Sequence, residues 1–168
     1  MKKRGVKILC SALAGLTMLT ACGQNGENAA DEAVTAAVDP AIAEVIEARQ
    51  KALKDVGGAF KAISDQFKAD SPDIEKIQLA AASVPTLTEG MAEWFPDGSG
   101  PEAGIETDAL PAIWESNEDF LSKVSDFQGA AANLNSVAQS GDVAAIGAAF
   151  KETGGTCKAC HDKYRLDD

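Results

Sequence analysis

The chain has 168 residues, which suits one domain of ordinary size together with a targeting segment. It is acidic, with 26 Asp and Glu against 15 Lys and Arg and a formal net charge of −11 at pH 7. A surface of this sign repels phosphate backbones, so we expect no nucleic-acid partner; it suits a basic protein partner, although acidity also serves solubility alone.

The N-terminus has the pattern of an export signal. A basic start, MKKRGVK, precedes an apolar run over residues 8–19 that is too short for a bilayer span of about 20 residues. This pattern predicts a signal peptide over residues 1–21 and a periplasmic location. The sequence LTAC, ending at Cys22, resembles the lipobox of bacterial lipoproteins, whose cysteine is lipidated after cleavage. The alternative is an ordinary signal peptide cut near Ala21, which would leave Cys22 incidental.

If Cys22 carries the lipid, residues 22–39 are a lipidated cysteine followed by a flexible tether, because this stretch is small, polar and lacks a helical apolar stripe. We therefore expect a domain held at a membrane surface by its lipid anchor. The sequence leaves open whether that membrane is the inner or the outer one.

The first two helices follow the tether. Asp39 and Pro40 form a helix start, and apolar residues then recur at alternating steps of four and three as far as Phe67, the stripe of a helix in a bundle. A second helix is predicted to start at Ser71–Pro72, and Pro85 is expected to kink it because proline removes a backbone hydrogen bond.

Two more helices follow a long Gly- and Pro-rich connection over residues 96–111. Apolar residues from Trp114 to Val137 predict the third helix, and Asp142 is expected to cap a fourth that continues to Tyr164. No strand-like alternation appears. The predicted fold is therefore all-α, an antiparallel four-helix bundle over residues 40–168.

The last helix carries the sequence CKACH. Helical spacing places Cys157, Cys160 and His161 over one face. The C-x-x-C-H pattern is the signature of covalent c-type haem attachment. Two thiols bond the vinyl groups of the porphyrin edge, and the adjacent imidazole ligates the iron. His161 is the only histidine, and no other thiol remains once Cys10 leaves with the signal and Cys22 is lipidated.

Three alternatives to haem attachment are weaker. A closed zinc site would need a carboxylate as its fourth ligand. A thioredoxin-type pair opens a helix after a strand, and no strand is predicted here. A chance match is the third alternative. We predict one covalent haem c per chain; the competing class is a redox or metal-binding lipoprotein without haem.

The side chains that could ligate iron limit what can occupy the sixth coordination position, on the side of the haem away from His161. There is no second histidine, and Met91 is the only methionine left after removal of residues 1–21. Met91 lies near the end of the second helix, so the sequence favours an open sixth position with His161 as the only strong axial ligand. The alternative is a low-spin electron carrier in which Met91 or another side chain is the sixth ligand.

Two arginines have two interpretations each. Arg49 lies on the apolar stripe of the first helix, where it either pairs with a haem propionate or extends its guanidinium to water. Arg165 follows His161 by four residues, and it either leans over the imidazole or only complements the dipole at the helix end.

Four segments show a specific resemblance over residues 40–166: IEARQKAL, WFPDGSG, LPAIW and CKACHDKYR. The chain resembles the cytochrome c′ family. The resemblance implies a four-helix bundle with the haem near the C-terminus and five-coordinate, high-spin iron that binds NO and CO but discriminates against O₂. It implies roles in electron transfer and in nitric-oxide binding or detoxification. Many members dimerise, so a homodimer is among the expected partners, beside a redox partner protein.

Carried onto this sequence, the resemblance implies six haem-contacting residues: the thioether cysteines Cys157 and Cys160, the axial ligand His161, its proximal neighbour Arg165, the propionate partner Arg49 and the distal Leu53. The lipobox departs from the family, whose typical members are free periplasmic proteins. Since the only histidine is committed to iron, no Cys–His or Ser–His pair remains for acyl transfer, and we expect no enzymatic activity.

The predicted distal face is small and apolar. Leu53 cannot ligate iron, and Gly57 and Gly58 follow one turn later. The glycines either leave room above the iron or permit close helix packing. No hydrogen-bond donor is evident, and bound O₂ gains more from a donor than NO or CO does. We therefore expect the pocket to favour NO and CO over O₂.

Overall fold

The computed structural model describes residues 38–166. The predicted signal peptide over residues 1–21, Cys22 and nearly all of the predicted tether lie outside the described residues. Within residues 38–166 the regular structure is helical, and the only extended pairing is an isolated antiparallel bridge between Ala109 and Arg165. None of the helices in this range is both long and apolar enough to cross a membrane.

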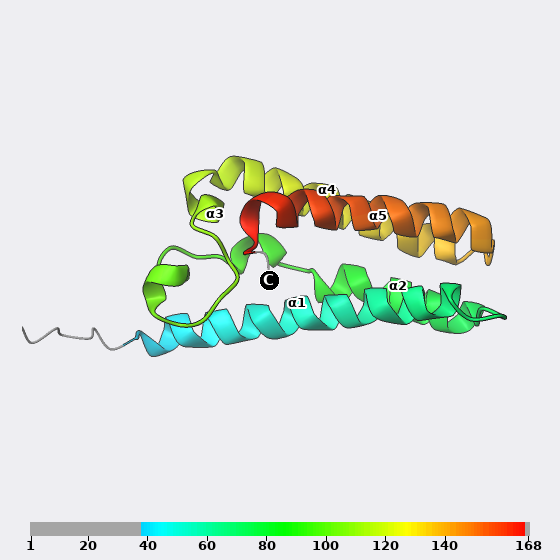
Figure 1. Cartoon of the computed structure of the whole chain (residues 1–168), viewed down its shortest axis with the longest axis horizontal. Helices are drawn as coiled ribbons and strands as arrows, with labels where there is room; N and C mark the ends of the chain where they lie inside the picture. The colour runs from blue at the N-terminus through cyan, green and yellow to red at the C-terminus, as the bar shows by residue number, and fades with distance from the viewer. Residues whose placement is uncertain (1–37, 167–168) are drawn as a thin grey trace, which may run out of the picture. The chain divides into compact units, whose positions relative to one another are not determined.

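Four long helices build the domain (Figure 1): α1 (Pro40–Phe67), α2 (Ile74–Leu87), α4 (Asn117–Ala138) and α5 (Val143–Tyr164). Three short elements lie between them: η1 (Met91–Glu93), η2 (Pro101–Ala103) and α3 (Ala112–Glu115). Helix α1 packs on α2, α2 on α4, and α4 on α5. This arrangement confirms the predicted four-helix bundle.

Local capping explains where the helices begin. Asp39 accepts a hydrogen bond from the Ala41 amide (2.9 Å), and Asp142 accepts from the amides of Ala144 and Ala145, so both predicted starts are confirmed. The predicted start of α2 is wrong by two residues. The carboxylate of Asp73 bonds the Lys76 amide, and α2 begins directly after it.

The middle of the chain also differs from the prediction. Pro85 lies in the last turn of α2, which ends two residues later, so the kink expected there would affect only that turn and stays a prediction. The predicted third helix is interrupted at Ser116, whose backbone leaves the helical region (φ −125°, ψ 45°). The Trp114 indole donates to the carbonyls of Phe95 and Pro96 (3.1 Å each), which fixes α3 against the connecting loop while α4 takes its own direction.

The apolar core falls into two clusters along the bundle. One is fully buried between the helices and includes Ile63, Ile77, Leu134 and Ile146. The other is built around buried side chains that include Val56, Met91, Phe120, Val124 and Tyr164, and both C-x-x-C cysteines pack against it. Phe60 packs against both clusters. The second cluster, unlike the first, forms the wall of a cavity.

Candidate functional site

A cavity of about 790 Å³ lies at the end of the bundle that holds the second cluster. Residues of α1, η1, α3, α4 and α5 form its wall, together with Phe95 and the loop over residues 106–109. This volume is within the range of cofactor sites. The apolar part of the wall consists of Leu53, Val56, Phe60, Met91, Phe95, Ile113, Phe120, Val124 and Phe127.

Cys157, Cys160 and His161 all line this cavity from α5, as their helical spacing predicted. The cysteines are half-buried and carry free thiols. Burial raises the pKa of both thiols, and the neighbouring Cys157 raises the pKa of Cys160 further. The pKa of His161 is lowered, first by burial and then by the charge of Arg165. The imidazole is therefore neutral at pH 7, which is the form that ligates iron.

The part of the cavity wall that α1 contributes leaves open space beside Leu53 and the glycine that follows it. Leu53 lines the cavity with 38 % of its surface exposed, and Gly57 lines it one turn later. Apart from the backbone of their own helix and their chain neighbours, a Cβ atom built at Gly57 or at Gly58 would meet no atom of the described residues within 4 Å. These glycines therefore do not serve the close packing of another helix against α1.

Arg49 does not extend to water. It is only 3 % exposed and lines the cavity. One Nη donates to Ser99 Oγ (2.9 Å), the other to the Ser99 carbonyl (2.7 Å) and to Thr107 Oγ1 (3.1 Å). The guanidinium also lies 4.8 Å from the ring centre of Phe95. Burial lowers the pKa of Arg49, and Glu102 opposes this effect. Arg49 thus ties α1 to the long loop.

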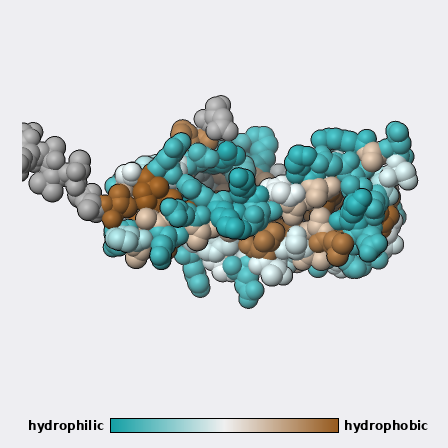
Figure 2. Space-filling view, turned by 90° about the horizontal axis from the view of Figure 1, so that it is seen from below, coloured by the Kyte–Doolittle hydropathy of each residue, from teal (hydrophilic) through white to brown (hydrophobic). Residues whose placement is uncertain are grey.

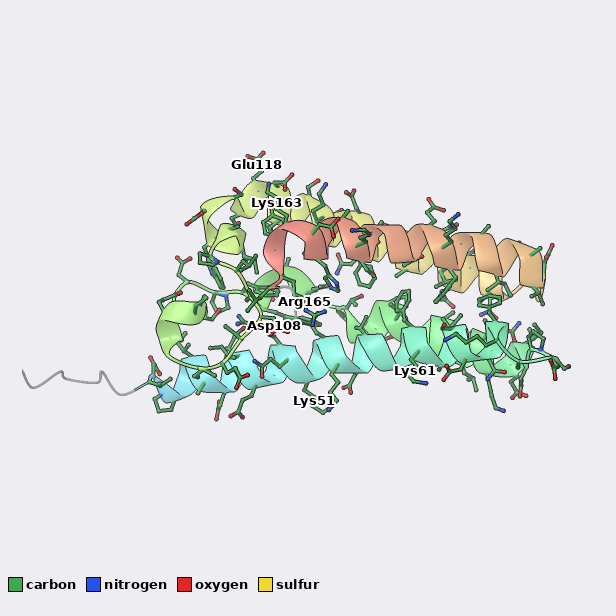
Figure 3. The ribbon with its side chains drawn as sticks, viewed as in Figure 1. Lys51, Lys61, Asp108, Glu118, Lys163 and Arg165 are labelled. Carbon is green, nitrogen blue, oxygen red and sulfur yellow. The ribbon has the colours of Figure 1, made fainter. Side chains whose placement is uncertain are left out.

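Arg165 lies just beyond α5 and also lines the cavity. Its Nη2 is 3.3 Å from Asp108 Oδ2, and Figure 3 shows the two side chains together at the end of α5. The backbone reinforces this contact, because the Leu110 amide donates to the Tyr164 carbonyl (3.0 Å) and the Leu166 amide to the Asp108 carbonyl (2.8 Å). The loop over residues 106–109 is thereby held against the C-terminal end of α5.

The charge of the cavity wall differs from that of the chain. Four basic residues line it, Arg49, Lys54, Lys123 and Arg165, against the acidic Glu106 and Asp108. Elsewhere hydrophilic residues prevail on the face seen in Figure 2, with hydrophobic residues in separate patches. A locally positive wall inside an acidic protein suits a ligand that carries carboxylates, as haem does.

The donor set therefore fits haem c. Two thiols, one neutral imidazole, an apolar interior and a cationic wall meet in one cavity of suitable size. Among residues 38–166, no group of three or more His, Cys, Asp or Glu side chains is placed to hold a metal ion, so the zinc alternative gains no support there.

Sequence reasoning named Met91 as a candidate sixth ligand but placed it away from the iron, and it missed the partners of Arg49 and of Tyr164. Met91 is 8 % exposed and lines the cavity, because Gly90 adopts a left-handed conformation (φ +70°) and η1 begins directly after it. The partners of Arg49 lie about 50 residues away in the loop. Tyr164 on the cavity wall is bonded to Asp119 on α4. Each depends on contacts between distant segments, which residue spacing does not reveal.

Comparison with known proteins places these features in a family. The family model described as Cytochrome C' matches residues 44–165. Cytochrome c′ of Rhodospirillum rubrum is 35 % identical over 161 residues, covering 95 % of this chain and 97 % of the relative. A cytochrome c-556 of Agrobacterium tumefaciens is 35 % identical over 122 residues, covering 72 % and 96 %.

Solved structures agree with this assignment. Cytochrome c′ from Thermochromatium tepidum superposes with a TM-score of 0.71 at 28 % identity, covering 75 % of this chain and 97 % of that one. Cytochrome c′ from Shewanella frigidimarina gives 0.69 at 36 % identity with the same coverage. A nitric oxide complex of a leucine variant from Alcaligenes xylosoxidans gives 0.67 at 29 % identity, covering 76 % and 97 %. The chain belongs to the cytochrome c′ family, whose members carry covalently bound haem c.

Proposed function

We propose that this haem protein has five-coordinate iron, binds NO and CO, and exchanges electrons in the periplasm. Cys157 and Cys160 bear the thioether bonds, and His161 is the axial ligand. The observation that carries the proposal is Leu53. On the α1 side of the cavity, position 53 holds an aliphatic side chain and position 57 a glycine, and neither can ligate iron; the polar residues of α1 on this wall are Arg49, Gln50 and Lys54.

The polar groups nearest this wall support discrimination against O₂. Gln50 lines the cavity, yet its amide donates to the Glu106 carbonyl (2.8 Å). Three donors of Arg49 are bonded to Ser99 and Thr107. These donors are engaged in holding the loop, which leaves Lys54 and Lys123 as the other cationic donors on the wall. A gas bound beside Leu53, away from these ammonium groups, would meet mainly apolar surface, which favours NO and CO over O₂. A nitric oxide complex is known for the Alcaligenes xylosoxidans relative.

The visible spectrum of the purified protein tests this proposal. We expect high-spin haem, with a broad Soret band and diffuse bands at longer wavelength in the ferrous state. Addition of NO or CO should shift the Soret band, whereas O₂ should give no stable complex. Sharp α and β bands in the unliganded ferrous protein would contradict an open sixth position.

One observation favours a second candidate, a low-spin electron carrier of the same fold. Met91 is on the cavity wall, closer to the site than its place in the sequence suggested. If its sulfur were the sixth ligand, Met91→Leu would convert a low-spin spectrum to a high-spin one. If the sixth position is open, this variant keeps the wild-type spectrum.

We also propose that Cys22 anchors the protein to a membrane, on the strength of the LTAC sequence. Cys22→Ser should move the protein from the membrane fraction to the soluble fraction without changing the haem spectrum. Mature wild-type protein that is soluble and carries no lipid by mass spectrometry would refute the anchor.

We further propose two protein partners, a basic redox partner and a second copy of this chain. The net charge of −11 supports the first. A structural relative described as undergoing ligand-controlled dimer dissociation supports the second. Electron transfer that weakens with added salt would agree with the first partner. Sedimentation velocity with and without CO tests the second, and a monomer under both conditions would refute it.

A further inference from the structure

Tyr164 is the only tyrosine of the chain, and it lies on the cavity wall. It is 2 % exposed and follows His161 by three residues on α5, so the two side chains are near neighbours on the helix. Its ring meets that of Phe120 edge to face, with 5.2 Å between ring centres. A haem iron ligated by His161 would therefore lie within short electron-transfer range of the Tyr164 phenol.

The phenol has a proton acceptor in place. Tyr164 Oη donates to Asp119 Oδ2 (2.5 Å), which also accepts from Lys163 Nζ (3.0 Å). These hydrogen bonds, the one from Tyr164 first, lower the pKa of Asp119, and Lys123 adds a weaker effect of the same sign. Burial raises the pKa of Tyr164. At neutral pH a protonated phenol therefore faces an ionised carboxylate.

We propose that Tyr164 is a redox-active residue that gives one electron to the haem when the protein reacts with hydrogen peroxide, while its proton moves to Asp119. Loss of an electron alone would leave a positive charge in a buried ring, which is costly. Transfer of the proton to Asp119 avoids that charge and leaves a neutral tyrosyl radical. The proposal rests on the proposed open position of the iron, through which peroxide reaches it.

The step balances as follows. Reduction of one peroxide molecule to two waters breaks the O–O bond and consumes two electrons and two protons. A haem held by Cys157, Cys160 and His161 would supply one electron, rising by one oxidation level, and Tyr164 would supply the other. The two protons come from solvent, and the phenolic proton is held on Asp119 Oδ2.

The other oxidisable rings are less well placed. Trp94 and Trp114 are not among the residues of the cavity wall. The indole N–H of Trp114 donates to two backbone carbonyls, which are not bases. Tyr164 alone among these three rings combines a place on the wall, burial and a carboxylate acceptor.

Freeze-quench EPR of the haem-loaded protein after addition of hydrogen peroxide tests the proposal. We expect a tyrosyl radical in wild type and its complete loss in Tyr164→Phe, with the peroxide-induced Soret change retained. Asp119→Asn keeps the phenol but removes its base, so most of the radical signal should be lost. Glu118→Gln is the matched control, because it neutralises the adjacent α4 carboxylate labelled in Figure 3 and should leave the signal at the wild-type level.

The outcomes are distinct. A Soret change without a tyrosyl signal, a signal that survives in Tyr164→Phe, or a radical assigned to Trp94 or Trp114 would overturn the role of Tyr164. A purely structural contact would give equal radical yields in wild type and Asp119→Asn, which would overturn the role of Asp119 and with it the proposal. A wild-type Soret band that peroxide leaves unchanged would refute both this proposal and the open iron position.

Discussion

Leu53 is the side chain on which access to the iron is expected to depend. It lines the cavity from α1, as does Gly57 one turn later, and among residues 38–166 a Cβ atom built at Gly57 would meet no atom within 4 Å outside its own helix backbone and chain neighbours. Leu53→Ala enlarges this space, so CO should bind the ferrous protein faster. A tenfold rise would correspond to a barrier lowered by about 1.4 kcal/mol. Stopped-flow CO binding measures the rate, and an unchanged rate would show that Leu53 does not guard the iron.

The opposite change at the same position supplies a ligand. Leu53→Met introduces a thioether on the cavity wall, and haem iron accepts methionine sulfur. We expect the spectrum to shift toward low spin and CO binding to slow, because the gas must then displace the sulfur. A fully high-spin spectrum in this variant would mean that position 53 does not reach the iron.

The two cysteines of α5 determine whether the haem is covalently held. Cys157→Ala together with Cys160→Ala should abolish covalent attachment, because no other thiol within residues 38–166 lines the cavity. Acid–acetone extraction, which removes non-covalent haem, provides the measurement. The control Cys22→Ser should retain its haem through the same extraction. Haem that resists extraction from the double variant would contradict the attachment site.

Cys157, Cys160 and His161 could be predicted from the sequence because they lie within two turns of a single helix, α5. The C-x-x-C-H spacing alone places two thiols and an imidazole on one face of α5. Arg49 could be singled out as a polar residue on an apolar stripe and a candidate propionate partner, but its partners Ser99 and Thr107 could not be predicted, since they lie in a distant loop. Tyr164 and Asp119 are 45 residues apart, and no periodicity relates them.

At the scale of elements, helix identity follows from periodicity, whereas helix ends follow from single hydrogen bonds. The stripe from Ile42 to Phe67 was sufficient to predict α1, and the caps at Asp39 and Asp142 are confirmed. The start of α2 depends on which side chain reaches a free amide, and that residue is Asp73. The break at Ser116 depends on the loop that holds Trp114, so the local pattern could not show it.

The link between α1 and the long loop gives a prediction about stability. Arg49→Met removes the buried guanidinium and with it three hydrogen bonds, and the Ser99 carbonyl is left without this donor. Hydrogen bonds to charged groups contribute about 1.5–3 kcal/mol, so a loss of roughly that size or more is expected in the free energy of unfolding. Urea denaturation followed by circular dichroism measures it.

Two further variants test whether the effect belongs to the loop contact. Ser99→Ala removes a hydroxyl that accepts from Arg49 and donates to the Pro96 carbonyl (2.8 Å), and it should cost about 1.5–3 kcal/mol. Lys51→Ala on the same helix breaks only an exposed ion pair with Asp55 and should cost between about 0 and 1 kcal/mol. A loss in Arg49→Met no larger than that in Lys51→Ala would show that the buried guanidinium does not hold the loop.

At the scale of the whole molecule, two electrostatic effects oppose each other as the pH falls. The chain carries a net charge of −11 at pH 7 and reaches neutrality near pH 4.5, so acidification first relieves repulsion among its carboxylates. Against this, Asp65, Asp73 and Asp119 each have a lowered pKa because they accept hydrogen bonds in the folded protein. The folded state loses those contributions only when these carboxylates become protonated.

Asp73 allows the second effect to be isolated. Its pKa is lowered first by the hydrogen bond from the Lys76 amide and then by the Lys76 side chain. A depressed folded-state pKa adds stability above the unfolded value of about 3.9 and loses it as the pH falls through the folded value. Asp73→Asn keeps a good N-cap, since Asn and Asp cap helices about equally well, but removes the titration.

We therefore expect wild type to be more stable than Asp73→Asn at pH 7, with the difference shrinking once the pH falls below about 4. Urea midpoints of the two haem-loaded proteins between pH 7 and pH 2.5 provide the test. Because the net charges of the two proteins differ by only one, relief of overall repulsion affects both almost equally and cancels in the difference. A difference that stays constant down to pH 2.5 would show that the Asp73 carboxylate does not contribute to acid unfolding through its ionisation.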